Sequence, residues 1–173
     1  VLSHMPTGTD TIHFIPRTSM PKGRSATYLR LVTAYRPQKT ETKRTRATVG
    51  GDKITYPGDV STKTAGLTTA KLLINSVLST PGAKCMVADI KDFYLNTPMS
   101  RYEYMKIPVD IIPAAIMQQY KLDSLVHNNF VYVEIRKGMY GLPQARRLAN
   151  DALVKHLFSH GYIQDEHTHG LFT

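Results

Sequence analysis

The apolar residues of this chain come in short segments, and none approaches the roughly 18–20 residues that a membrane-spanning helix requires. A membrane-spanning helix is therefore excluded, and the remaining pattern is mixed. Segments rich in β-branched and aromatic residues predict strands at 11–15, 27–35, 44–49, 53–56 and 130–136. The turn signal Gly50-Gly51-Asp52 predicts that 44–49 and 53–56 pair as a hairpin.

Apolar residues at helical spacing predict two helices, at 67–78 and from 144 to about 159. Pro81-Gly82 ends the first, and Gly161 is a plausible end for the second. Residues 84–90 (KCMVADI) are short and mostly apolar, which is typical of a buried strand. Residues 162–163 and 171–173 resemble the starts of strands, so the sequence ends as a truncated piece of a larger protein would.

Positive charge is concentrated in residues 17–46, which hold nine basic residues and one acid of a chain whose formal net charge is +9. The basic residues are Arg17, Lys22, Arg24, Arg30, Arg36, Lys39, Lys43, Arg44 and Arg46. A local field of this sign attracts polyanions and releases counterions from nucleic acid. A solvated basic surface, a nucleoside triphosphate site and a site for an acidic protein are the alternatives that charge alone leaves open.

Length and composition set broad limits. The chain has 173 residues, 42% of them hydrophobic and 20% charged, which fits one globular domain or part of a larger protein and disfavours wholesale disorder. The single cysteine, Cys85, excludes an internal disulfide framework and a cysteine-rich zinc site. Residues 1–5 (VLSHM) resemble the remnant of an expression vector.

Asp89 is the strongest candidate for chemistry. It ends the predicted buried strand, where a rigid backbone could aim its carboxylate into a cleft, and Asp92 follows three residues later. Oxygen ligands of this kind suit Mg²⁺. The alternative is that Asp89 only caps the turn after the strand.

Other chemistry-bearing residues have simpler interpretations. Phe93 is typical of core packing, and Tyr94 is less so because its hydroxyl group needs a polar partner. Gln144 could bond to a sugar hydroxyl, but alone it marks only the start of a helix. His156 and His160 lie four apart on the predicted helix without a cysteine or carboxylate at a zinc-site spacing, so a core or surface role is favoured.

Two segments together resemble a known family. Residues 87–96 (VADIKDFYLN) resemble the first polymerase motif of the reverse transcriptases of long-terminal-repeat retrotransposons, most of all the copia type. Residues 131–149 (VYVEIRKGMYGLPQARRLA) resemble the later motif of that family, which opens a long helix. Weaker matches at 30–36, 160–162 and 170–172 extend the resemblance from Arg30 to Phe172.

The resemblance implies an α+β fold: the fingers and a partial palm of a right-hand polymerase, with an antiparallel sheet backed by helices. It implies fingers at 6–66, palm at 67–97 with the first catalytic motif, fingers again at 98–147 and truncated palm at 148–173. The implied activity is that of an RNA-directed DNA polymerase, a nucleotidyltransferase that uses Mg²⁺, with Mn²⁺ as a substitute. The implied partners are an RNA or DNA template–primer and dNTP, without a membrane. The implied location is a cytoplasmic retroelement particle with a nuclear phase.

The resemblance also assigns roles to residues. Asp89 would be the catalytic metal ligand, with the backbone carbonyl of Ile90 as a further ligand. The incoming nucleotide would be bound by Arg30, Lys22, Arg24, Asp92 through its backbone N–H, Tyr94 as a steric gate against ribonucleotides, and Gln144. The nucleic acid would be bound by Arg36, Lys39, Lys43, Arg44 and Arg46.

Two departures from the family pattern bear on activity. Arg146 stands where the family has a small residue or proline, which could alter the template path. The second catalytic motif, a pair of aspartates in a hydrophobic strand, is absent, because Asp165-Glu166 lies in a polar turn. The 173 residues alone are therefore predicted not to polymerise. The alternatives are a non-catalytic nucleic-acid-binding domain derived from a retroelement and a scaffold without a nucleic-acid role.

Overall fold

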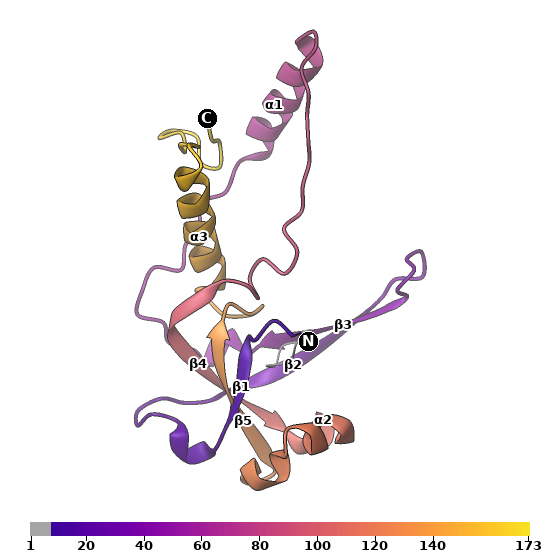
Figure 1. The fold of residues 1–173 in the computed structure, drawn as a ribbon, viewed down its shortest axis with the longest axis vertical. Helices are drawn as coiled ribbons and strands as arrows, with labels where there is room; N and C mark the ends of the chain where they lie inside the picture. The colour runs from indigo at the N-terminus through magenta and orange to yellow at the C-terminus, as the bar shows by residue number, and fades with distance from the viewer. Residues whose placement is uncertain (1–7) are drawn as a thin grey trace.

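The computed structural model describes residues 8–173, so the predicted vector remnant lies outside the described residues. Within this range, five strands and three α-helices are joined by loops and short 3₁₀ turns (Figure 1). The strands are β1 (Ile12–Ile15), β2 (Thr27–Tyr35), β3 (Lys43–Val49), β4 (Pro98–Pro108) and β5 (Phe130–Lys137). The helices are α1 (Leu67–Ser79), α2 (Ala114–Gln119) and α3 (Ala145–Ser159).

The strands form one sheet in the order β1-β5-β4-β2-β3. All neighbours are antiparallel except β2 and β4, which run parallel and pair only at Thr27 with Met105 and at Tyr28 with Lys106. The predicted α+β class with a mainly antiparallel sheet is confirmed at this level.

The core brings together strands from both ends of the sheet. Ile12 of β1 and Val49 of β3 come from opposite ends of the strand order, yet both belong to the same buried cluster. The alternation predicted for β5 is confirmed, because Val131, Val133 and Ile135 are fully buried on one face. Met105, Met139 and Leu142 complete the centre of the cluster.

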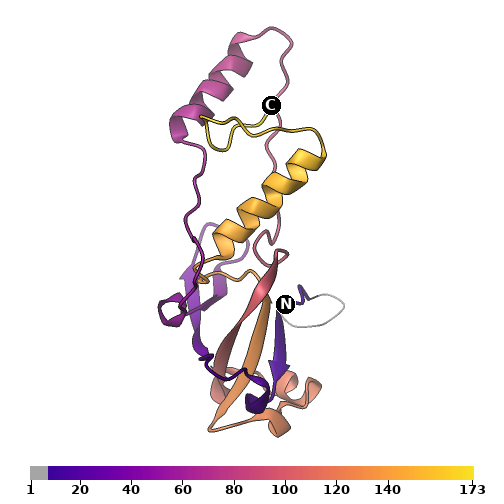
Figure 2. The same cartoon turned by 90° about the vertical axis from the view of Figure 1, so that its left-hand side faces the viewer.

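The two longer helices have different surroundings. Helix α3 buries Ala145 and Ala149 at its start, and Leu148 packs against the core. Helix α1 buries no residue and exposes its apolar side chains, including Leu72, Leu73 and Ile74. It stands at the far end of the molecule from β5, as two views show (Figures 1 and 2). Of the two helices that the sequence predicted, α3 therefore packs on the described core and α1 does not.

Two predicted strands are wrong. Residues 84–90 form no strand and are exposed, with Met86 at 87% and Val87 at 93%, because no described strand pairs with this segment. Residues 53–56 do not pair with β3; Gly51–Lys53 is a 3₁₀ turn, and β3 instead pairs with β2 through a turn at its other end. The backbone of an apolar segment needs hydrogen-bonding partners to become a strand, and periodicity does not reveal them.

Gly141 anchors β3 to the segment before α3. Its φ is +97°, and a Cβ atom there would overlap the Val49 carbonyl oxygen. The Val49 N–H donates to the Tyr140 carbonyl oxygen at 2.7 Å, so the two backbones are held together. Only glycine satisfies both the conformation and the close approach.

Gly141→Ala is expected to lower the free energy of unfolding by about 3 kcal/mol. The backbone at Val49 would have to shift, and the alanine would have to adopt a strained positive φ. Gly161→Ala is the matched control: its φ is +88°, but nothing lies within 4 Å of the added methyl group. The control should lose only about 1 kcal/mol. Urea unfolding measures both values, and equal losses would show that the close approach to Val49 has no energetic role.

Candidate nucleic-acid interface

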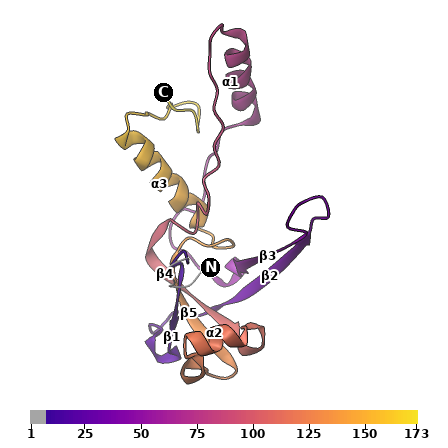
Figure 3. The same ribbon diagram turned by 45° about the vertical axis from the view of Figure 1, so that its right-hand side comes forward.

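The β2–β3 hairpin projects from the sheet as an arm, which we define as residues 30–48. It extends away from the rest of the chain in two views (Figures 1 and 3). Nearly all of its side chains are exposed, and Tyr35 near the tip is 70% exposed. A stretch this polar and this rich in charge forms a two-stranded ribbon that buries little surface.

The register places three arginines on one face of the arm. Arg30 lies opposite Thr48, Val32 opposite Arg46 and Ala34 opposite Arg44. Opposite residues of an antiparallel pair point to the same side, as do residues two apart in one strand. Arg30, Arg44 and Arg46 therefore share one face, which we call the basic face.

The basic face is open to a ligand. Arg30, Arg44 and Arg46 are all exposed, and none forms an ion pair within the described residues. Among residues 8–173, the Arg30 guanidinium group donates only a long 3.5 Å hydrogen bond, to the Tyr28 hydroxyl. Three guanidinium groups without a carboxylate partner leave a positive field that a polyanion can neutralise.

The tip of the arm is less strongly basic. Arg36 donates to the Glu41 carboxylate at 2.8 Å, and its backbone N–H donates to the Thr42 carbonyl oxygen across the turn. This pair closes the hairpin and neutralises one predicted contact. Lys39 and Lys43 stay exposed beside it.

A cleft of about 460 Å³ lies at the foot of the arm, between β3, β1 and the turn at 92–95. Arg44, Arg46, Asp92 and Tyr140 supply its polar and aromatic groups. The apolar part is formed by Ile12, Phe14, Ala47, Leu95 and Ile116. Asp92, predicted at the nucleotide, thus lies in the same cleft as two arginines predicted at the nucleic acid, although these residues are far apart in the sequence.

Tyr94 lies beside this cleft. Its ring is half-buried and packs edge-to-face on Tyr140, with ring centroids 5.1 Å apart. Edge-to-face packing orients both rings. Tyr140, which is 43% exposed, presents the more accessible aromatic surface.

The other predicted nucleotide residues lie elsewhere. Gln144 is 1% exposed and donates its amide to Glu103 at 3.2 Å. Arg24 pairs with the same carboxylate at 2.6 Å, while Lys22 is exposed in the loop before β2. Arg30 lies on the basic face. The structure therefore divides the predicted nucleotide site between the arm, its cleft and a cluster around Glu103.

Asp89 and Ile90 lie on the exposed extended segment between α1 and the turn at 92–95. An exposed carboxylate and a backbone carbonyl are the kinds of oxygen donor that Mg²⁺ accepts, so the residues fit this ion in type. Within residues 8–173, however, no group of three or more His, Cys, Asp or Glu side chains is placed to hold a metal ion. Asp89 would therefore need carboxylates from elsewhere to complete a site.

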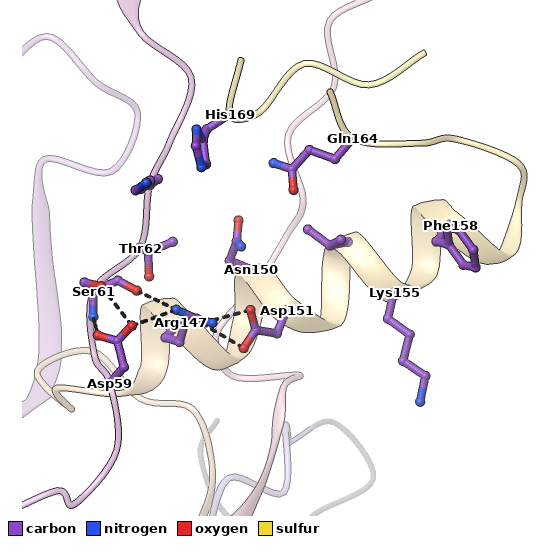
Figure 4. A pocket seen from close by; sticks show the side chains of 12 residues that line it. Asp59, Ser61, Thr62, Arg147, Asn150, Asp151, Lys155, Phe158, Gln164 and His169 are labelled. Atoms are coloured by element: carbon purple, nitrogen blue, oxygen red, sulfur yellow. Dashed lines mark hydrogen bonds and ion pairs between the residues drawn. The ribbon is translucent and has the colours of Figure 1, made fainter. Parts of the chain in front are cut away.

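A second, polar cavity of about 550 Å³ was not predicted (Figure 4). Arg147 of α3 donates to Asp151 from Nε at 3.0 Å and to Asp59 from Nη1 at 3.0 Å. Ser61 donates its N–H and hydroxyl to Asp59, and these bonds together with Arg147 lower the pKa of Asp59. Hydrogen bonds and charge from Asp151, with a smaller contribution from Asp59, raise the pKa of Arg147. Arg147 thus links the 59–61 loop to α3. No local sequence signal indicates this role, because Arg147 and Asp59 are 88 residues apart.

No helix in the described part of the chain is long and apolar enough to span a membrane.

No protein-family description, curated protein or solved structure matches this chain. The resemblance to reverse transcriptases therefore depends on the sequence motifs alone.

Proposed function

We propose that this chain comprises the fingers and part of the palm of an RNA-directed DNA polymerase, and that its arm binds the backbone of a template–primer. The observation that carries the proposal is the basic face: Arg30, Arg44 and Arg46 on one side of an exposed ribbon, without carboxylate partners in the described residues. The polymerase motifs at 87–96 and 131–149 support the more specific assignment.

The geometry of the arm suits a polyanion better than a single small anion. Arg44 and Arg46 are two residues apart on one strand, about 7 Å along its axis, and Arg30 lies on the neighbouring strand. Duplex nucleic acid carries about one negative charge per 1.7 Å of axis, so it can meet all three arginines at once. Arginine also forms paired hydrogen bonds with phosphate oxygens.

The foot of the arm adds a place for a base. The cleft offers the exposed ring of Tyr140 and an apolar wall beside Arg44 and Arg46. Bases stack on aromatic side chains irrespective of sequence, while nearby arginines hold the backbone. A polymerase must accept any template sequence, and this combination provides contact without base readout.

The catalytic part of the proposal places Asp89 as a Mg²⁺ ligand, together with the Ile90 carbonyl. Bound Mg²⁺ would supply positive charge that stabilises the phosphoryl group being transferred. Asp92 and Tyr94 would lie at the nucleotide, and further carboxylates would be needed beside Asp89.

The binding proposal is tested by salt dependence. Fluorescence anisotropy with a labelled RNA–DNA template–primer should give a dissociation constant whose logarithm rises with log salt concentration. The slope should be about 2.7 or more, since each of three neutralised phosphates contributes about 0.9. A control titration with a neutral polymer of similar size should give no signal. Binding that does not weaken between low and moderate salt would contradict a role for the basic face.

A further inference from the structure

A small cavity of about 140 Å³ lies apart from the lining of the arm-foot cleft, where the loop before β2 meets the loop after Gly51–Lys53 and strand β4. Its charged walls are Arg24, Lys53, Arg101 and Glu103. Three cations face one carboxylate, so the cavity carries a formal charge of +2. Arg101 and Lys53 have no role in the interface described above.

The two arginines are held in place. Glu103 has a 5% exposed side chain, and it pairs with Arg24 at 2.6 Å while Arg101 Nε lies 3.8 Å away. Gln144 donates to the same carboxylate from its buried side. Arg24 also lies over the ring of Tyr104, and Arg101 lies over the ring of Tyr56. These contacts fix both guanidinium groups, which lowers the entropic cost of binding a ligand.

Several donors in this cavity remain unused by the described protein. Arg24 uses its Nη2 for Glu103 and the Tyr102 carbonyl oxygen, and Arg101 uses its Nη2 for the Thr55 carbonyl oxygen. The Nη1 groups of both arginines and the exposed ammonium group of Lys53 form no hydrogen bond or ion pair within residues 8–173. Donors from three separate chain segments surround one small space.

We propose that this cavity is a binding site for a single phosphate group. Its charge of +2 matches a phosphate dianion, and planar guanidinium groups bind phosphate oxygens in pairs. A cavity of about 140 Å³ has room for one phosphate group with its five heavy atoms. The site does not depend on polymerase activity, and it would accept inorganic phosphate or the terminal phosphate of a nucleic acid.

Isothermal titration of the whole chain with inorganic phosphate tests the site, and a dinucleotide with and without a 5′-phosphate distinguishes the two sources. Lys53→Gln should weaken phosphate binding by about tenfold, since one charge-assisted hydrogen bond is lost. Lys53 is exposed and forms no ion pair in the described residues, so the fold should not depend on it. Lys71→Gln, an exposed charge removal on α1, should leave phosphate binding unchanged.

Two outcomes would overturn the site: wild-type chain that does not bind phosphate at millimolar concentration, or Lys53→Gln that binds as tightly as wild type. The site is also separable from the arm. Substituting Arg30, Arg44 and Arg46 should weaken template–primer binding but leave inorganic phosphate binding intact. If those substitutions removed phosphate binding while Lys53→Gln did not, the phosphate would lie on the arm instead.

Discussion

Replacing Arg30, Arg44 and Arg46 together by glutamine is expected to weaken template–primer binding by about two orders of magnitude near 0.1 M salt. Each arginine that neutralises a phosphate releases about 0.9 counterion, so the three together should also lower the salt slope by about 2.7. Glutamine retains length and polarity, and the side chains are exposed, so the hairpin should still form. Anisotropy over a salt series measures both quantities.

The matched control removes the same number of charges elsewhere. Lys71, Lys121 and Lys155 are exposed and lie outside the arm, so their combined replacement by glutamine should change affinity only slightly. Circular dichroism should show unchanged secondary structure in both triple variants. Equal weakening by the two variants would mean that net charge, rather than the basic face, determines binding.

Asp89→Asn is expected to reduce primer extension by at least about a hundredfold in a longer form of the protein that carries the paired-aspartate strand. An amide oxygen is neutral and binds a divalent cation more weakly than a carboxylate, and metal stabilisation of phosphoryl transfer amounts to several kcal/mol. Because Asp89 is exposed and lies outside the arm, template–primer binding should remain nearly intact. Single-turnover extension and anisotropy on the same samples separate the two effects.

Asp110→Asn is the control for this experiment, since Asp110 is an exposed aspartate in the 3₁₀ turn Val109–Ile111. It should extend primers at the wild-type rate. Wild-type extension by Asp89→Asn would remove Asp89 from catalysis. If a longer wild-type form bound template–primer but never extended it, the chain would be a non-catalytic nucleic-acid-binding domain.

Elements whose signals are local were predicted well. Strand β2 was predicted at its observed bounds, and α1, α3 and β5 within one residue, because their periodicity and end signals lie within the elements themselves. Strand β4 was missed, since charged residues interrupt it and one of them, Glu103, is buried only because Arg24 and Gln144 accompany it. The partner of β3 was wrong because Gly50-Gly51 resembled a hairpin turn, whereas these glycines permit close approach to Tyr28 and Gly141.

The candidate site was predictable in its charge but not in its shape. Counting charges located the basic stretch, and only the β2–β3 register reveals that Arg30, Arg44 and Arg46 share a face. The cavity around Lys53 and Arg101 joins segments that sequence spacing does not relate. Gln144 was assigned to the nucleotide from its position in the family motif. That position does not reveal that the side chain is buried, with 1% of it exposed.

The attachment of the arm has a mechanical consequence. Strand β2 pairs with β4 at only two positions, and the backbone hydrogen bonds of Gly50 and Val49 hold β3 at the same end, so the backbone attachment of the ribbon is concentrated at its base. An arm attached at one end in this way could move about Thr27 and Tyr28 without breaking its own ladder. It could follow the curvature of a bound duplex, and the stiffness of its base would then set how far the three guanidinium groups reach.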